Sequence, residues 1–181
     1  MKNYLLLFVL IFTVSLQSCG KKIISNSAEK KISKGQYALL SEINNPETIL
    51  LVQLNGDNIY NKYIRKHMMN EYSHKYDFLT VKNAYQHYTA YPRVGYNFKI
   101  FDEPKFVGKF EDSTKYRFFI GQYYVTRKVT KVSDGSNQES TVFDCHYYIL
   151  DRQTNKKLEL PKSSISYSPL FQGYIKGIEV L

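Results

Sequence analysis

The stretch YRFFIGQYYVTRKVTKV, Tyr116 to Val132, decides the fold class of this chain. Aromatic and β-branched residues dominate it, and such residues favour extended strands. We expect one long strand that bends near Gly121, since a glycine inside a strand often marks a bend or bulge. The polar residues 133–137 predict a loop, and TVFDCHYYIL, Thr141–Leu150, predicts the strand that returns from it.

The residues after this hairpin continue the same pattern. A turn is predicted over 151–155 and a short strand over 156–160, before Pro161. Three consecutive strands with short connections predict an antiparallel meander. A final strand is predicted over Tyr174–Leu181.

Two further strands and a helix are predicted upstream of the meander. The strands cover Tyr37–Ile43 and Thr48–Leu54, on either side of a turn signal at residues 44–46. The helix covers Asn58–Tyr76, where apolar and aromatic residues recur every three to four positions, and Asp57 is a suitable N-cap.

One face of this predicted helix is rich in tyrosine. We expect that face to pack on the sheet, because aromatic helix faces usually serve cores; the alternative is a tyrosine-lined ligand groove. The face consists of Tyr60, Tyr63, Ile64, His67, Met68, Glu71 or Tyr72, and Tyr76.

The segment from Phe78 to Tyr91 is ambiguous and is compatible with a second helix that ends before Pro92. From Tyr96 onward, alternating apolar residues predict strands again, through Phe106–Phe110. The sequence therefore predicts an α+β fold, in which one or two helices pack on a largely antiparallel sheet of five to seven strands.

The first 18 residues have the layout of an export signal. Lys2 makes the amino end positive, and an apolar run follows from Tyr4 to Leu16. As a helix this run would reach roughly 20 Å, which is short of the ~30 Å hydrocarbon core of a bilayer. The alternative is a buried helix of the domain, although globular domains rarely open with so bare an apolar block.

The four residues Leu16–Cys19, LQSC, resemble the lipobox of bacterial lipoproteins. Leu16, Ser18 and Cys19 match that family's pattern, whereas Gln17 departs from it, since a small residue is more usual there. The resemblance covers only the first residues of the chain. It implies that the chain is cut between Ser18 and Cys19 and that Cys19 carries a diacylglycerol through a thioether. The alternative is an ordinary signal peptide that ends near a cysteine.

These observations divide the chain into three parts. Residues 1–18 are the predicted signal peptide, 19–35 the lipidated cysteine and a flexible tether, and 36–181 a single globular α+β domain. The tether is polar and rich in lysine, and the alternative for it is a first helix docked on the domain. In the bacterial lipoproteins that this segment resembles, sorting signals lie just after the cysteine. No acidic residue follows Cys19 directly, so the resemblance implies an outer membrane anchor that faces the periplasm rather than display outside.

Composition narrows the range of partners. The 181 residues carry a formal net charge of +9, with 17 tyrosines and no tryptophan. A basic exported protein suits anionic lipid headgroups, acidic polysaccharide or an acidic protein, and nucleic acid is not an expected partner outside the cytoplasm. The lysines are scattered, so the alternative is a basic surface that serves only solubility.

The sequence contains no motif that fixes a reaction. His67 and His74 lie seven residues apart on the predicted helix, about 10 Å along its axis, which is too far for one metal ion without a third ligand. His87 would complete such a site only through folding that the spacing does not show.

Cys145 shares a strand face with apolar neighbours, while His146 points to the other face. We therefore expect Cys145 to be an inert core thiol.

Other catalytic and binding patterns are weak or missing. The sequence has no Gly-x-Ser-x-Gly elbow and no phosphate-binding glycine loop. The acidic pairs Asp102–Glu103 and Glu111–Asp112 lie at predicted turns, where solvated caps are more usual than catalytic carboxylates. The run Tyr123–Lys128 mixes aromatic and basic residues, as single-stranded nucleic-acid platforms do, but it is also what one buried and one exposed strand face would contain.

We therefore predict a cell-envelope lipoprotein that is a non-enzymatic binding or assembly module, held to the membrane at Cys19 and contacting a protein partner. No catalytic residue, metal or cofactor is predicted. One alternative is a hydrolase-like envelope enzyme with a site assembled from distant residues. The other is an immunity or inhibitor protein that neutralises an exported toxin. The candidates for the enzyme's site are His67, His74, His87, Asp102 and Glu103.

Overall fold

The computed structural model describes residue 26 and residues 42–55, 57–85, 100–101, 103–133, 136–160 and 167–181. The predicted signal peptide, Cys19 and the predicted tether lie outside these ranges, apart from the single residue Asn26. Most of the strand predicted over 37–43 also lies outside them, and residues 42–44 form a short 3-10 turn.

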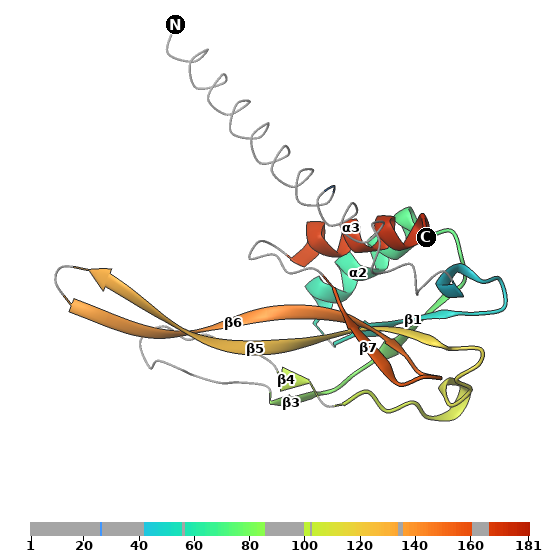
Figure 1. Cartoon of the computed structure of the whole chain (residues 1–181), viewed down its shortest axis with the longest axis horizontal. Helices are drawn as coiled ribbons and strands as arrows, with labels where there is room; N and C mark the ends of the chain where they lie inside the picture. Colours follow the sequence, from blue (N-terminus) through green and yellow to red (C-terminus); the bar gives the residue numbers. More distant parts are fainter. Residues whose placement is uncertain are drawn as a thin grey trace, which may run out of the picture.

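A five-stranded sheet forms the centre of the fold, in the order β2-β1-β5-β6-β7 (Figure 1). Its strands are β1 (Leu50–Leu54), β2 (Tyr76–Thr80), β5 (Phe118–Ser133), β6 (Ser136–Asp151) and β7 (Lys156–Glu159). Strands β5, β6 and β7 form the predicted antiparallel meander, whereas β1 pairs in parallel with both β2 and β5. The predicted α+β class is confirmed.

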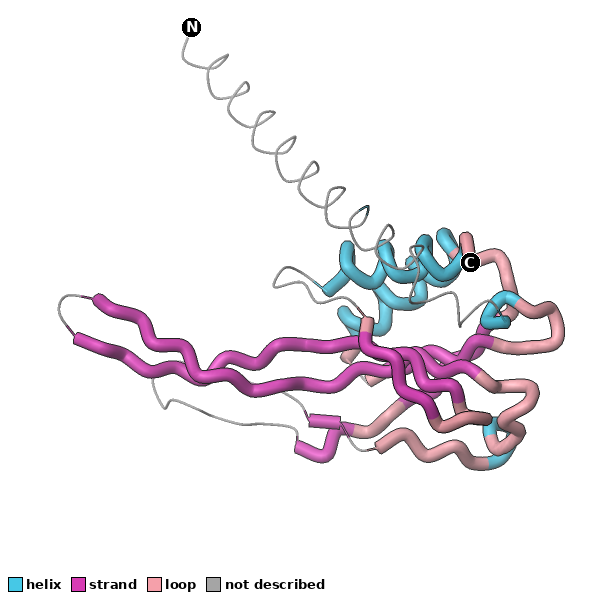
Figure 2. The backbone as a smooth tube through the Cα atoms, in the orientation of Figure 1, coloured by secondary structure: helices cyan, strands magenta, loops and turns pink. Residues whose placement is uncertain are grey.

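Two helices, α2 (Asn58–Glu71) and α3 (Tyr167–Glu179), cover one face of the sheet (Figure 2). The N-cap prediction for α2 is confirmed, because Asp57 Oδ1 accepts a 2.9 Å hydrogen bond from the backbone N–H of Tyr60. Helix α2 ends at Glu71 rather than at Tyr76, since Tyr76 is the first residue of β2 and pairs with Leu50.

The final strand predicted over Tyr174–Leu181 is wrong, because helix α3 occupies this part of the chain. The buried residues Phe171, Tyr174, Ile175 and Ile178 recur at helical spacing and all pack into one core. Only a window that begins before Tyr174 reveals this period, since the last eight residues alone also fit a short apolar strand.

The second helix considered for Phe78–Tyr91 is wrong over its described part. Strand β2 continues to Thr80, and Asn83–Tyr85 forms β3, which pairs antiparallel with β4 (Ile100–Phe101) in a separate small sheet. Residues 86–91 lie outside the described ranges.

The alternation at Phe106–Phe110 also does not produce a strand, because Gly108 has a φ of +61° and begins the 3-10 turn η2 (Gly108–Phe110).

The sheet has a hydrophobic core on each face. Leu50, Val52 and Leu54 of β1 join the core that α2 and α3 cover, and Leu51 joins the opposite core. Parallel strands covered on both faces are typically this apolar.

The predicted tyrosine face of α2 is confirmed at Tyr60, Ile64, His67 and Met68, which are buried. It is wrong at Tyr63, which is 39% exposed because it lies on the flank of the helix.

Strands β5 and β6 extend far beyond the rest of the sheet as a two-stranded projection (Figure 1). We call this projection the arm and define it as Tyr123–Ser133 together with Ser136–His146. The strands extend into the loop predicted over 133–137, because Ser133 and Ser136 are register partners. At ~3.3 Å per residue the arm is roughly 35 Å long.

None of the helices in the described ranges is long and apolar enough to cross a bilayer.

Candidate functional site

The residues that the sequence suggested for lipid attachment and signal cleavage, Cys19 and Ser18, lie outside the described ranges, as do His87 and Asp102. Glu103 is exposed. Among the described residues, no group of three or more His, Cys, Asp or Glu side chains is placed to hold a metal ion.

His67 lies between the two helices. Its Nε2 forms a 2.9 Å hydrogen bond with Ser168 Oγ of α3, and its ring packs near Phe171. Burial lowers the pKa of His67 below its usual value, so the ring is neutral at pH 7. No described carboxylate is hydrogen-bonded to its other nitrogen, as a catalytic serine–histidine pair would need. The contact therefore joins α2 to α3.

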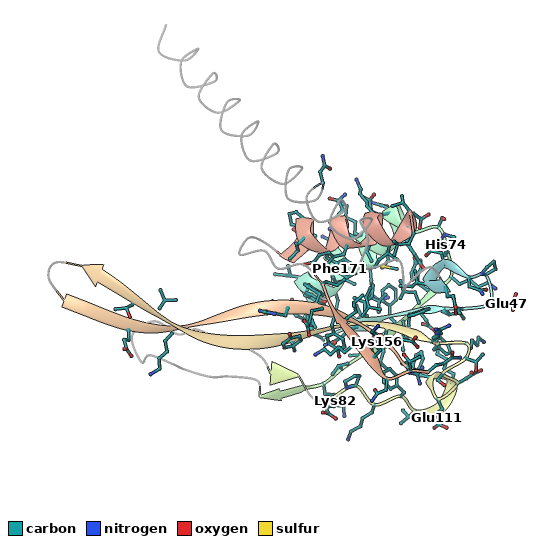
Figure 3. All side chains as sticks on the ribbon, viewed as in Figure 1. Glu47, His74, Lys82, Glu111, Lys156 and Phe171 are labelled. Atoms are coloured by element: carbon teal, nitrogen blue, oxygen red, sulfur yellow. The ribbon has the colours of Figure 1, made fainter. Side chains whose placement is uncertain are left out.

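His74 has different neighbours. Its Nε2 lies 4.0 Å from Glu179 Oε2, at the far end of the helix layer (Figure 3). Glu179 also accepts a 3.1 Å hydrogen bond from the backbone N–H of Ser73. The structure therefore does not bring His67 and His74 into one site.

Cys145 faces the helix-side core, as the sequence predicted. Its neighbours in that core include Tyr147 and Ile149, and its Sγ donates a 3.5 Å hydrogen bond to Gln122 Oε1. Burial raises the pKa of the Cys145 thiol to about 12. The thiol is therefore a poor nucleophile at neutral pH.

Five residues gather where the arm leaves the sheet, and of these only Tyr123 belongs to a pattern that the sequence suggested as a binding site. We call Tyr123, His146, Tyr148, Lys157 and Glu159 the arm-root cluster. Tyr123 of β5 is the register partner of His146 of β6, and their ring centroids lie 5.2 Å apart. Tyr148, two residues along β6, lies 6.0 Å from Tyr123 by the same measure. The three rings form a continuous row.

Lys157 and Glu159 of β7 complete this cluster. The Lys157 ammonium lies 4.1 Å from the ring centroid of Tyr123 and 4.2 Å from that of Tyr148, so two aromatic faces contact one cation. The Tyr123 hydroxyl donates a 2.8 Å hydrogen bond to Glu159 Oε2. Burial, followed by this hydrogen bond, raises the pKa of Tyr123 to about 12, so its hydroxyl keeps its proton and remains a donor.

The aromatic row continues into the core on the same face of the sheet. Tyr148 packs on Phe119, and Phe119 packs edge-on against Phe106 with centroids 5.4 Å apart. The Arg152 guanidinium lies 3.9 Å above the ring of Phe106 and donates a 2.7 Å hydrogen bond to the backbone carbonyl of Tyr116. The root of the arm is therefore fixed to the body of the domain by aromatic and cation–π contacts.

The backbone at this point also changes partner. β1 pairs with β5 only through Leu51↔Phe119 and Val52↔Ile120. Two residues further along β5, the backbone N–H of Gln122 instead donates a 2.9 Å hydrogen bond to the side-chain Oε1 of Gln53. A side chain thus replaces the backbone partner where the arm begins.

Beyond this root, each arm strand is paired, within the described ranges, with the other arm strand. The last pair between β6 and β7 is Tyr148↔Glu159, and the register of β5 with β6 runs on to Ser133↔Ser136. The outer N–H and C=O groups of such a ribbon can pair with another strand. The arrangement thus supports binding through backbone pairing more readily than it supports a reaction.

Sequence reasoning noticed Tyr123 but missed the cluster. The partners come from three strands, and their contact depends on the hairpin register, which the predicted loop at 133–137 left open. Comparisons with known proteins found no family model, no curated protein and no solved structure that matches this chain.

Proposed function

We propose that this chain is a cell-envelope lipoprotein, anchored through Cys19 to the periplasmic face of a bacterial outer membrane, and that it is a non-enzymatic binding or assembly module. The observation that carries the binding role is the arm. The anchor rests on the resemblance of residues 16–19 to a lipobox.

A free two-stranded ribbon is marginally stable in water, and proteins usually cover, bend or shorten such edges. Among the described strands, each arm strand pairs only with the other over roughly 35 Å. A partner that adds a strand could pair with outer backbone groups of the ribbon, which is the mode of recognition called β-augmentation. The arm is therefore the part of the fold whose geometry is best explained by a partner.

The arm-root cluster supports this role, because a binding element gains affinity when it is held in place before the partner arrives. Lys157 between two tyrosine rings, and Glu159 on the Tyr123 hydroxyl, fix the direction in which the ribbon leaves the sheet.

The anchor is tested by replacing Cys19 with alanine in the full chain and separating soluble from membrane fractions. We expect the variant to be released or to remain unprocessed, whereas a Cys145→Ala control should stay with the membrane fraction. An unprocessed variant is recognised because it keeps its signal peptide and so runs larger on a gel. A processed Cys19→Ala protein that still fractionates like wild type would contradict the anchor.

The binding role is tested by shortening the arm. Thr126 and Phe143 are register partners, so Asn-Gly can replace residues 127–142 and close the hairpin as a two-residue turn. Mild cross-linking in cells, followed by mass spectrometry, should recover a recurrent partner with the full chain and lose it with the short arm. Circular dichroism and urea unfolding check that the shortened protein is folded. A partner retained by the folded short-arm variant, or no recurrent partner for the full chain, would contradict a binding role for the arm.

A further inference from the structure

We infer that the outer face of helix α2 rests on an anionic lipid surface. This inference depends on the proposed lipid anchor and adds the orientation of the domain on the membrane. The α2 outer face is defined as Ile59, Lys62, Tyr63, Lys66 and Met69.

Exposed apolar side chains are unusually frequent on this face. Ile59 is 65% exposed, Met69 is 73% exposed and Tyr63 is 39% exposed, which makes them three of the few large hydrophobic side chains exposed in the described ranges. The spacing places Ile59, Lys62, Lys66 and Met69 on the side of the helix opposite Ile64 and Met68, which are buried in the core, and places Tyr63 on the flank beside them.

The charges of this face are all positive. Lys62 and Lys66 are exposed, and neither forms an ion pair with a described residue. The carboxylate on α2, Glu71, is turned toward α3, where it accepts a 2.5 Å hydrogen bond from Gln172 and lies 3.7 Å from Lys176 Nζ. A helix face with isolated apolar side chains among lysines is typical of a helix that lies in the interface of an anionic bilayer.

The route of the chain brings this face toward the proposed anchor. Asn44, near the start of the continuously described domain, donates a 2.7 Å hydrogen bond to the carbonyl of Ile178 at the end of α3. The Tyr72 hydroxyl, at the end of α2, donates a 3.1 Å hydrogen bond to Asn44 Oδ1. The chain therefore enters the domain at the helix layer and not on the opposite face of the sheet.

The length of chain between the anchor and this entry point allows contact. The predicted tether places 16 residues, 20–35, between Cys19 and the start of the predicted domain, and a flexible linker of that length spans roughly 20 Å. That span is similar to the length of α2, which is roughly 21 Å for its 14 residues. A domain held this closely by its helix layer can lay α2 on the bilayer while the arm remains free.

A protein partner fits this face less well than a lipid surface does. The apolar side chains are separated by lysines, whereas protein interfaces have a contiguous core from which lysine is depleted. Lysine and isolated apolar side chains, in contrast, both find favourable partners at the headgroup level of an anionic bilayer.

The test places a fluorescent probe on the native, lipidated protein. Cys145→Ala removes the other thiol, and Met69→Cys then carries an environment-sensitive nitrobenzoxadiazole label. Glu111→Cys is the matched control, since Glu111 is exposed on the far side of the sheet from α2 (Figure 3). Both proteins are reconstituted into vesicles of phosphatidylethanolamine and phosphatidylglycerol, and into vesicles of phosphatidylcholine alone.

We expect the fluorescence at position 69 to rise several-fold on the anionic vesicles, to rise less on phosphatidylcholine, and to be quenched by spin-labelled lipid. The fluorescence at position 111 should not change. Lys62→Glu with Lys66→Glu should abolish most of the rise, whereas Lys105→Glu with Lys156→Glu, the same change of charge elsewhere, should preserve it.

Two results would overturn the inference. One is a probe at position 69 that behaves like the probe at position 111 on anionic vesicles. The other is a photo-crosslinker at position 69 that captures a protein rather than lipid in cells. Failure of the anchor is distinguished because it is read separately, as release of the labelled protein from the vesicles during flotation.

Discussion

Gln53 Oε1 accepts a 2.9 Å hydrogen bond from the backbone N–H of Gln122, between two residues that are both buried. The bond lies where β1 stops pairing with β5 and the arm begins. One amide side chain thus satisfies a buried backbone donor that the sheet itself leaves without a strand partner.

Replacing Gln53 by methionine keeps the approximate volume and removes this acceptor. Because a buried donor without an acceptor is costly, we expect the free energy of unfolding to fall by about 1–3 kcal/mol. Urea denaturation measures the change. Gln153→Met, in an exposed turn, is the control and should have almost no effect. A Gln53→Met protein as stable as wild type would show that this bond contributes nothing.

Gly121 is predicted to be intolerant of even a methyl group. A Cβ at this position would overlap Cζ of Tyr148 and would lie 2.7 Å from Cε1 of Phe119. Both rings are buried and cannot move aside freely. Gly121→Ala should therefore destabilise the protein by about 1–3 kcal/mol, as overpacked cores do.

The cause is separated by a double-mutant cycle with Tyr148→Ala. In that background the tyrosine ring is gone, so Gly121→Ala should cost less than it does in the wild-type protein. Equal costs in the two backgrounds would assign the effect to the contact with Phe119 or to the backbone of β5 instead of to the contact with Tyr148.

Stability should depend on pH through His67. Burial lowers its folded-state pKa, while Glu71 opposes this shift and Lys66 and Lys176 add to it. The unfolded chain therefore binds a proton more readily, so the stabilisation is complete above the unfolded pKa of about 6.5 and decreases as the pH falls through that value.

Urea denaturation at pH 7.5 and at pH 5 measures this dependence. His67→Gln should be less stable than wild type at pH 7.5 but should lose less stability between the two pH values. Asn70→Gln, at an exposed position on the same helix, is the control, and its loss should match that of wild type. A slope unchanged by His67→Gln would show that other groups cause the dependence.

Cys145 should react slowly with iodoacetamide in the native protein. A thiol whose pKa is raised to about 12 supplies few thiolates at pH 8, so we expect alkylation roughly a thousandfold slower than that of a free cysteine. Mass spectrometry follows the modification with time, and urea should restore the normal rate. Thr154→Cys, in an exposed turn, provides the fast reference. Rapid native alkylation of Cys145 would contradict its placement in the core.

The elements with strong local signals could be predicted from the sequence. Strand β1, the N-cap Asp57, and the meander from Phe118 to Glu159 each follow from residues close together in the chain. Helix α3 was missed because its apolar period begins before Tyr174, and the parallel pairing of β1 was missed because its partners are distant in sequence.

The arm-root cluster could not be predicted for a similar reason. The contact of Tyr123 with Lys157 depends on the register of β5 with β6, in which Ser133 pairs with Ser136. A shift of one residue would move every side chain of β6 to the other face of the sheet. Local patterns identify the aromatic residues but do not determine which of them meet.

The position of β1 in the sheet has a consequence for the rate of folding. Strands β5, β6 and β7 are joined by short turns, so these contacts form between neighbours in the sequence. Leu51 and Phe119, in contrast, belong to strands separated by a long intervening chain, and closing that chain costs entropy before the contact stabilises anything. We expect the meander to assemble first and the insertion of β1 between β2 and β5 to limit the rate. Mutations in β7 should then slow refolding with little change in the unfolding rate, whereas mutations of equal cost in β1 should divide their effect between the two rates.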